Sequence, residues 1–145
     1  MTMRFALAKT PEEYKRCADI WLEASLGAHA FIPSGFWKEN YAPMWSRYLP
    51  SSTVHTALAA TGIIGFGSVK DNVLEALFVI PEAQGKGVGS SLLTYLFSVY
   101  DALSLAVYVK NPKAVAFYER SGFARATRQI CAHTGEEEIL MRWRR

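Results

Sequence analysis

Three glycines at alternate positions lie in the stretch from Gln84 to Ser90, between an apolar run and a segment with helical spacing. Glycine allows positive φ angles and a close approach of the backbone to a ligand. The start of the following helix supplies N–H groups without partners and the positive end of the helix dipole. Lys86 adds a cation. The stretch therefore predicts a site for a phosphate or pyrophosphate, although a tight turn without a ligand could carry the same glycines.

The residues around Lys86 exclude two other phosphate-binding motifs. A Walker A loop has Ser or Thr directly after Gly-Lys, whereas Gly87 follows here. A dinucleotide fingerprint has the spacing G-x-G-x-x-G, whereas the third glycine here, Gly89, comes one residue too early. A chain of 145 residues is also too short for a Rossmann domain together with a substrate domain.

Tyr118 and His29 have side chains that could transfer protons. Asn111, followed by Pro112, is the expected N-cap of the short helix that carries Tyr118. A tyrosine hydroxyl within hydrogen-bond reach can act as a general acid; the alternative for Tyr118 is packing. His29 stands in an apolar segment and could act as a base or bind an amine, or it could simply pack. His55 and His133 are expected at a strand edge or in a turn, without a role.

Two blocks of the sequence resemble the GCN5-related N-acetyltransferase (GNAT) family. Residues 79–89, VIPEAQGKGVG, resemble its acetyl-CoA signature V-x-P-x-x-[QR]-G-x-G-x-[GA]. Residues 111–123, NPKAVAFYERSGF, resemble a second block, N-x-x-A-x-x-F-Y-x-x-x-G-F, in the order the family has. The expected order of helices and strands also agrees with the family along the whole chain. The segment from Ala24 to Ile32 looks most like the small bacterial YiaC/YjaB subgroup.

The resemblance implies that the chain binds acetyl-CoA as its acyl donor. Backbone N–H groups of the glycine-rich turn would hold the pyrophosphate, and the pantetheine arm would pair with the preceding strand as another strand would. Asn111 and Tyr118 would also contact the donor. The remaining residues implied in donor binding are Leu77, Phe78, Val79, Gln84, Gly85, Lys86, Gly87, Val88, Gly89 and Ser90.

The family resemblance also implies direct transfer to a primary amine in a ternary complex. Tyr118 occupies the position of the acid that protonates the departing thiolate, and the Val79 N–H would meet the oxyanion. Some members carry a glutamate on the strand before the second block, where this chain has Ala106. The candidate bases are therefore Glu75, acting through water, and His29, unless the amine arrives neutral and needs no base.

The acceptor site is expected around His29, with Phe31 and Trp37 beside it. The resemblance leaves a protein lysine, a protein N-terminus and a small-molecule amine as acceptors. A non-catalytic module that binds or senses acyl-CoA is the alternative function, and the presence of Tyr118 argues against it, because binding alone needs no acid there.

The pattern of apolar residues and turn residues predicts one α/β (α+β) domain over residues 1–145, with a mixed, mostly antiparallel sheet of six to seven strands and about four helices. Pro11 and Glu13 predict a capping box on Thr10, and Pro43 should kink or split the second helix. The apolar run 73–80 predicts a strand buried on both faces. Strands are expected at 4–8, 53–60, 63–70, 73–80, 103–109, 124–132 and 137–143, and helices from 10, within 34–49, at 88–100 and from 111 to 122.

The composition favours an ordinary cytoplasmic protein, with a net charge of +3, 50% hydrophobic and 20% charged residues. No basic stripe with interleaved aromatic residues predicts nucleic-acid binding. No leader-like start or membrane-length apolar run is visible. Cys17 and Cys131 have no metal-ligand spacing, so no metal is expected, and both are predicted to be small core residues in a reducing compartment. Monomer and homodimer both stay open.

Overall fold

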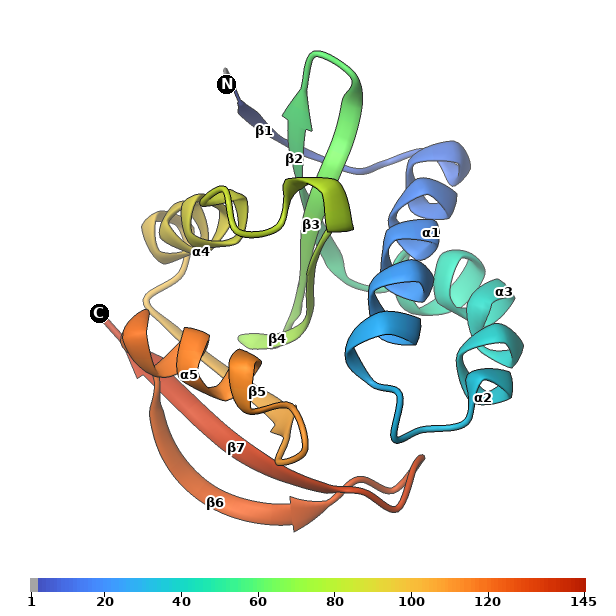
Figure 1. The fold of residues 1–145 in the computed structure, drawn as a ribbon. Coiled ribbons are helices and arrows are strands. Elements are labelled where there is room, and N and C mark those ends of the chain that lie inside the picture. Colours follow the sequence, from blue (N-terminus) through green and yellow to red (C-terminus); the bar gives the residue numbers. More distant parts are fainter. Residues whose placement is uncertain (1–2) are drawn as a thin grey trace.

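The computed structural model describes residues 3–145, so the first two residues of the predicted domain lie outside the description. Seven strands form one sheet in the order β1-β2-β3-β4-β5-β7-β6 (Figure 1). The strands are β1 Arg4–Leu7, β2 Thr53–Ala59, β3 Gly62–Lys70, β4 Val73–Val79, β5 Ala102–Tyr108, β6 Ala124–Ile130 and β7 Glu137–Arg144. The helices are α1 Pro11–Ala28, α2 Ser34–Glu39, α3 Tyr41–Pro43, a π-helix Met44–Tyr48, a 3₁₀ turn Pro81–Ala83, α4 Val88–Val99 and α5 Pro112–Arg120.

The first helix begins as its capping residues predict. The Thr10 hydroxyl accepts the Glu13 N–H, and the Glu13 carboxylate accepts the Thr10 N–H at 3.0 Å. Two N–H groups that a helix start leaves without partners are thereby satisfied. The buried face of α1 packs on β3 and β4 and holds Cys17, Ile20 and Trp21. This packing fixes the position of the C-terminal end of α1, where His29 follows.

The helix expected over 34–49 is interrupted twice. α2 ends at Glu39, and α3 ends at Pro43, the proline predicted to kink or split the helix. A π-turn follows, in which the Leu49 N–H donates to the Met44 carbonyl at 2.9 Å. Short π segments widen a helix and are frequent at functional sites. Here the π-turn brings Met44 and Tyr48 to face the end of the sheet that holds the cavities described below.

The central feature of the sheet is the divergence of β4 from β5. β4 pairs along its length with β3, whereas it pairs with β5 only at Val73 and Ser104. The two parallel strands therefore separate toward their ends at Val79 and Tyr108. The prediction that β4 is buried on both faces was wrong, because Val73 and Glu75 are exposed. A strand that leaves its neighbour, as β4 leaves β5, gives up the cover of a central strand.

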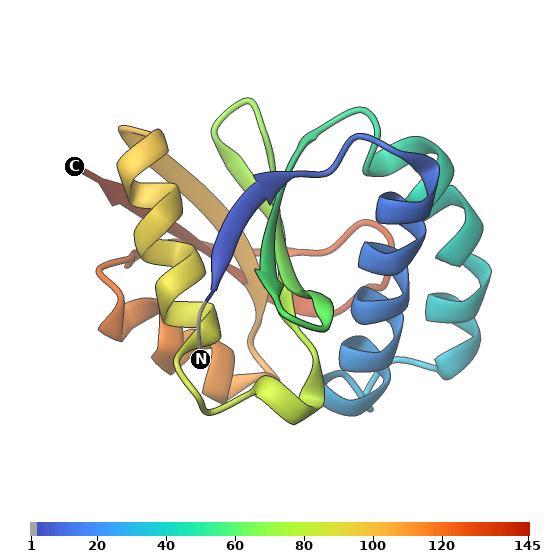
Figure 2. The ribbon, with the colours of Figure 1, turned by 90° about the horizontal axis from the view of Figure 1, so that it is seen from above.

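Helices cover both faces of the sheet, as the view in Figure 2 shows. α1 and the short helices after it enclose one core with β2, β3 and β4, centred on Phe66 and Leu49. α4 and α5 enclose the other core with β5 and β7, centred on Leu96 and Met141. Within residues 3–145, no helix combines the length and apolar character needed to cross a membrane.

Candidate active site

The glycine-rich turn presents a row of free backbone donors. Gly85 and Gly87 have φ angles of 75° and 84°, which non-glycine residues adopt only with strain. Gly87 is the N-cap of α4 and provides no side-chain cap. Within the described chain, none of the N–H groups from Gly85 to Ser90 has a hydrogen-bond acceptor. A Cβ at Gly85 or Gly87 would meet nothing within 4 Å, so the space beside the turn is open. This donor set fits a pyrophosphate.

The edge of β4 that faces β5 carries further free donors. Ile80 donates its N–H to Ile64 on β3, and N–H groups along a strand point alternately to either side. The N–H groups of Leu77 and Val79 therefore point away from β3, into the gap beside β5. The Gln84 side chain donates to the Val79 carbonyl at 3.0 Å. Gln84 thus ties the turn to the end of β4, a role for its side chain that its backbone alone would not provide.

α5 places the second sequence block beside this turn. Asn111 caps α5 as predicted, because its Oδ1 accepts the Ala114 N–H at 3.3 Å. A Cβ built on Gly89 would lie 3.5 Å from the Phe117 ring and 3.9 Å from Cγ2 of Val79. The end of β4, the start of α4 and α5 therefore meet at one point. These three segments carry most of the residues predicted to bind the acetyl donor, and together they are called the donor wall below.

Tyr118 lies on α5, between Phe117 and Phe123. Its ring meets those two rings edge to face, with centroids 5.2 and 5.6 Å away. The hydroxyl has no hydrogen-bond partner among the described residues, and the side chain as a whole is half-buried. Burial of the hydroxyl, which disfavours its charged form, raises the pKa of Tyr118 well above its ordinary value. This hydroxyl is therefore protonated at neutral pH, as a general acid must be.

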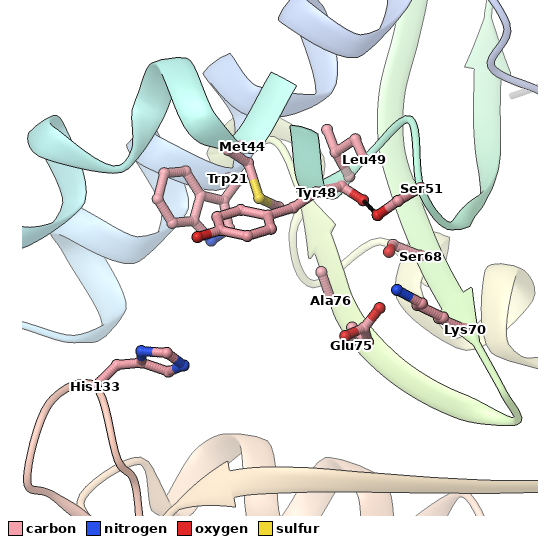
Figure 3. Close-up of a pocket in the computed structure, with 10 residues that line it drawn as sticks. All are labelled: Trp21, Met44, Tyr48, Leu49, Ser51, Ser68, Lys70, Glu75, Ala76 and His133. Atoms are coloured by element: carbon pink, nitrogen blue, oxygen red, sulfur yellow. Dashed lines mark hydrogen bonds between the residues drawn. The ribbon is translucent and has the colours of Figure 1, made fainter. Parts of the chain in front are cut away.

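Two adjoining cavities lie between β4, α1, the short helices after α1 and the β6–β7 turn. The larger has a volume of about 300 Å³ and the smaller about 190 Å³. They share Trp21, Met44, Tyr48 and His133, so they form one groove. Figure 3 shows the larger cavity, with Glu75 and Lys70 on one side and His133 reaching in from the β6–β7 turn. Its remaining lining residues are Leu49, Ser51, Ser68 and Ala76.

Glu75 reaches this groove because β4 is bulged. Ser68 pairs with Ala76 and Val69 pairs with Leu74, so Glu75 is the extra residue between them. The bulge turns Glu75 to the same side as Ala76, and both line the larger cavity. Partial burial raises the pKa of Glu75, against the opposing effect of Lys70. A carboxylate with a raised pKa that remains open to water has the properties of a general base.

The predicted acceptor residues lie around the other end of the groove. Trp37 lines the smaller cavity, whereas neither cavity is lined by His29 or Phe31. His29 is only 8% exposed and stacks on Trp37, with ring centroids 5.4 Å apart. Its Nε2 lies 3.2 Å from the Asn111 amide nitrogen. The role of His29 as a base stays a prediction, and in this geometry its Nε2 lone pair already has a partner.

Sequence reasoning missed two residues of the β6–β7 turn. His133 received no role, yet it lines both cavities. Cys131 was predicted to be a core residue, yet it is half-exposed and lines the smaller cavity. Although burial opposes ionisation, hydrogen bonds from Thr134 and from the backbone of His133 together lower the pKa of Cys131. The only sequence signal for these two residues was the predicted hairpin, and its residues do not indicate that the turn points toward the groove.

His55, the other histidine without a predicted role, lies on β2 rather than at a sheet edge. β2 pairs with β1 and with β3. The His55 Nε2 lies 2.8 Å from the Tyr100 hydroxyl, and both residues are remote from the groove. Burial lowers the pKa of His55. His55 is therefore a packed interior residue, and its lack of a site role agrees with its place in the fold.

Comparisons with known proteins agree with this geometry. Residues 50–125 match the model of the Acetyltransferase (GNAT) domain. The peptidyl-lysine N-acetyltransferase YiaC of Escherichia coli is 31% identical over 106 residues, which are 72% of this chain and 73% of YiaC.

Solved structures show the same fold. The solution structure of apo YjaB from Escherichia coli has a TM-score of 0.86 at 23% identity, covering 99% of this chain and 98% of YjaB. The PaiA N-acetyltransferase of Thermoplasma acidophilum, solved with coenzyme A, has a TM-score of 0.81 at 17% identity, covering 100% of each chain. The predicted GNAT fold, N-acetyltransferase class and acetyl-CoA donor are thus confirmed, and the chain belongs to the GNAT acetyltransferase family.

Proposed function

We propose that residues 1–145 form one N-acetyltransferase domain that moves an acetyl group directly from acetyl-CoA to a protein lysine in a ternary complex. One observation carries the proposal. β4 has the free N–H groups of Leu77 and Val79 at its open edge and the Glu75 carboxylate in the groove, two residues from Leu77. Donor and acceptor can therefore meet at the same strand, and direct transfer needs no covalent acyl-enzyme.

The chain's own residues supply what the transfer requires. Acetyl-CoA brings a thioester, whose acyl carbon is attacked by a neutral amine. Glu75, through water, accepts the proton that the attacking amine loses. The Val79 N–H donates to the thioester oxygen as negative charge develops there. The Tyr118 hydroxyl donates its proton to the sulfur as the carbon–sulfur bond breaks. The turn from Gln84 to Ser90 holds the pyrophosphate.

The lining of the groove supports a lysine as the acceptor. Trp21 and Tyr48 present aromatic surface that suits an alkyl chain and its ammonium group, with Glu75 as the counter-charge. Tyr48 is 47% exposed, so the groove opens to the surface, where a protein could present a side chain. YiaC is named for activity on peptidyl-lysine. The two free thiols, Cys17 and Cys131, fit the cytoplasm as the place of action.

Release of free thiol from acetyl-CoA with a set of amines tests this function. We expect a peptide with one internal lysine and a blocked N-terminus to be acetylated, and the same peptide with arginine in place of lysine to be inert. A peptide with a free N-terminus and no lysine, free lysine and a polyamine complete the set. Turnover confined to the free N-terminus or to small amines would contradict the lysine proposal. Acetyl-CoA binding without turnover on any amine would contradict direct transfer.

Tyr118→Phe tests the proposed acid. The change removes a hydroxyl that has no partner within the described residues, so packing and CoA binding should persist. We expect kcat to fall about 100-fold, in the range that general acid–base catalysis contributes. The control is Tyr95→Phe, because Tyr95 is another half-buried tyrosine and lies away from the groove. Equal kcat values for Tyr118→Phe and the unmodified protein would remove Tyr118 from the mechanism.

Glu75→Gln tests the proposed base through its pH dependence. The pKa of Glu75 is raised, and the carboxylate can accept a proton only above that pKa. Activity that depends on Glu75 is therefore lost as the pH falls through the raised pKa. We expect the ratio of kcat/KM between the unmodified protein and the variant to be roughly 10 to 100 at pH 8 and to shrink on acidification. Titration of the amine itself affects both proteins and cancels in the ratio. Glu23→Gln, on the exposed face of α1, is the control. A ratio that stays constant with pH would exclude Glu75 as the base.

A further inference from the structure

His29 occupies an unusual place for a titratable residue. It follows α1 as its C-cap, where its N–H donates to Ser25, and it is 8% exposed. Its ring stacks on Trp37 and meets the Tyr108 and Phe31 rings edge to face, with centroids 5.1 and 5.7 Å away. The aromatic rings enclose it, and neither cavity reaches it. His29 can therefore act only through the atoms that its ring touches.

The hydrogen bonds of Asn111 determine the protonation state of His29. The Asn111 Oδ1 accepts the Ala114 N–H at 3.3 Å, which leaves the NH₂ group to face His29. This NH₂ group lies 3.2 Å from the His29 Nε2 and can only donate. Nε2 is therefore the acceptor, and the proton of the neutral ring is on Nδ1. That Nδ1 atom is buried and has no partner among the described residues. This arrangement of partners fits the neutral imidazole.

The hydrogen bond between His29 and Asn111 spans the divergence of the sheet. His29 follows α1, which packs on β3 and β4, while Asn111 follows β5 and begins α5. The two halves of the sheet pair at Val73 and Ser104 and separate toward Tyr108, the ring that contacts His29. The contact therefore links the halves at the open end of the gap, beside the donor wall.

We propose that His29 is a positioning residue, which holds Asn111 in the orientation that caps α5 and so keeps the donor wall assembled. Without an acceptor at Nε2, the Asn111 amide can rotate and exchange its oxygen and nitrogen, and the Ala114 N–H then loses its cap. α5 carries Phe117, which lies against the start of α4, and Tyr118. The inference rests on the proposed donor site and adds a residue from outside it.

The hydrogen bond from the Asn111 NH₂ group to the His29 Nε2, called the latch below, can form only while the imidazole is neutral. A second proton would be on Nε2, where it would face the Asn111 NH₂ group, donor against donor. Burial lowers the pKa of His29 below its ordinary value of 6.5, so the latch opens only when the pH falls below that value. The other titratable or charged groups nearby are Tyr108, whose pKa burial raises to about 12, the Cys131 thiol beside it, and the Lys110–Glu136 ion pair above Phe31.

Two substitutions of similar size separate the latch from simple packing. The amide oxygen of glutamine can occupy the position of Nε2, so His29→Gln keeps an acceptor for Asn111 that does not titrate. The amide of asparagine reaches only to the position of Nδ1, so His29→Asn loses the acceptor. Calorimetric titration with CoA between pH 8 and pH 5.5 compares both variants with the unmodified protein. Thermal unfolding of each variant at every pH shows that it is folded.

We expect His29→Gln to bind CoA within about twofold of the unmodified protein at pH 8, and His29→Asn about fivefold more weakly, as the loss of a helix cap implies. On acidification, the CoA affinity of the unmodified protein should fall more than that of His29→Gln, because only His29 gains a proton at Nε2. Titration of the CoA phosphates affects both proteins alike and cancels in the comparison. Equal affinities of all three proteins at every pH would overturn the latch. So would an equal loss on acidification in the unmodified protein and His29→Gln at a pH where ring nitrogen shifts show His29 of the unmodified protein to be protonated.

Failure of the latch is distinguishable from failure of the donor site. If the unmodified protein does not bind CoA at all, the donor assignment is wrong, and the latch with it. If it binds CoA normally while the variants match it, only the latch is wrong. Nitrogen chemical shifts of the His29 ring at pH 8 add an independent check, since the latch requires the proton on Nδ1. A proton on Nε2 would contradict the geometry on which the inference stands.

Discussion

The divergence of β4 from β5 is the constraint on which the site depends. Two parallel strands that stayed paired would satisfy each other's backbone groups and leave no donor for a ligand. Here pairing stops after Val73 and Ser104, so the N–H groups of Leu77 and Val79 lack protein partners. The turn after β4 continues this row of donors into the start of α4. β4 therefore has N–H groups paired with β3 on one side and free N–H groups on the other, which suits it to bind the proposed ligand.

The same strand separates two chemical environments. On the side of the gap, backbone N–H groups and a helix start favour an anion. On the side of α1, the bulge at Glu75 directs one carboxylate into a groove with aromatic residues, where Lys70 lies beside it. The His29–Asn111 contact then joins the two halves of the sheet where they are farthest from their shared pairing. One strand thus carries both the free backbone N–H groups and the carboxylate that the proposed transfer from donor to amine uses.

Local sequence signals predicted the parts of the fold that depend on local physics. The capping box at Thr10, the Asn111 cap and the positive φ angles of Gly85 and Gly87 all follow from residue type and spacing. These backbone features could be predicted because they are set by neighbours in the sequence. Glu75 and Trp37, which line the proposed acceptor groove, were candidates from the sequence. The assembly of the groove itself could not be predicted, because it depends on contacts distant in the sequence. His133 lines the groove because of the direction that the β6–β7 hairpin takes. Glu75 points into it because of a bulge in β4, which leaves no local sequence signal.

Amide hydrogen exchange along β4, measured residue by residue with and without saturating CoA, tests whether the free N–H groups of β4 bind the donor. We expect CoA to slow exchange at Leu77 and Val79, whose N–H groups face the gap, at least tenfold more than at Phe78, whose N–H group faces β3. Bound CoA that leaves Leu77 and Val79 exchanging at their original rates would contradict this expectation, because the ligand would then be held elsewhere.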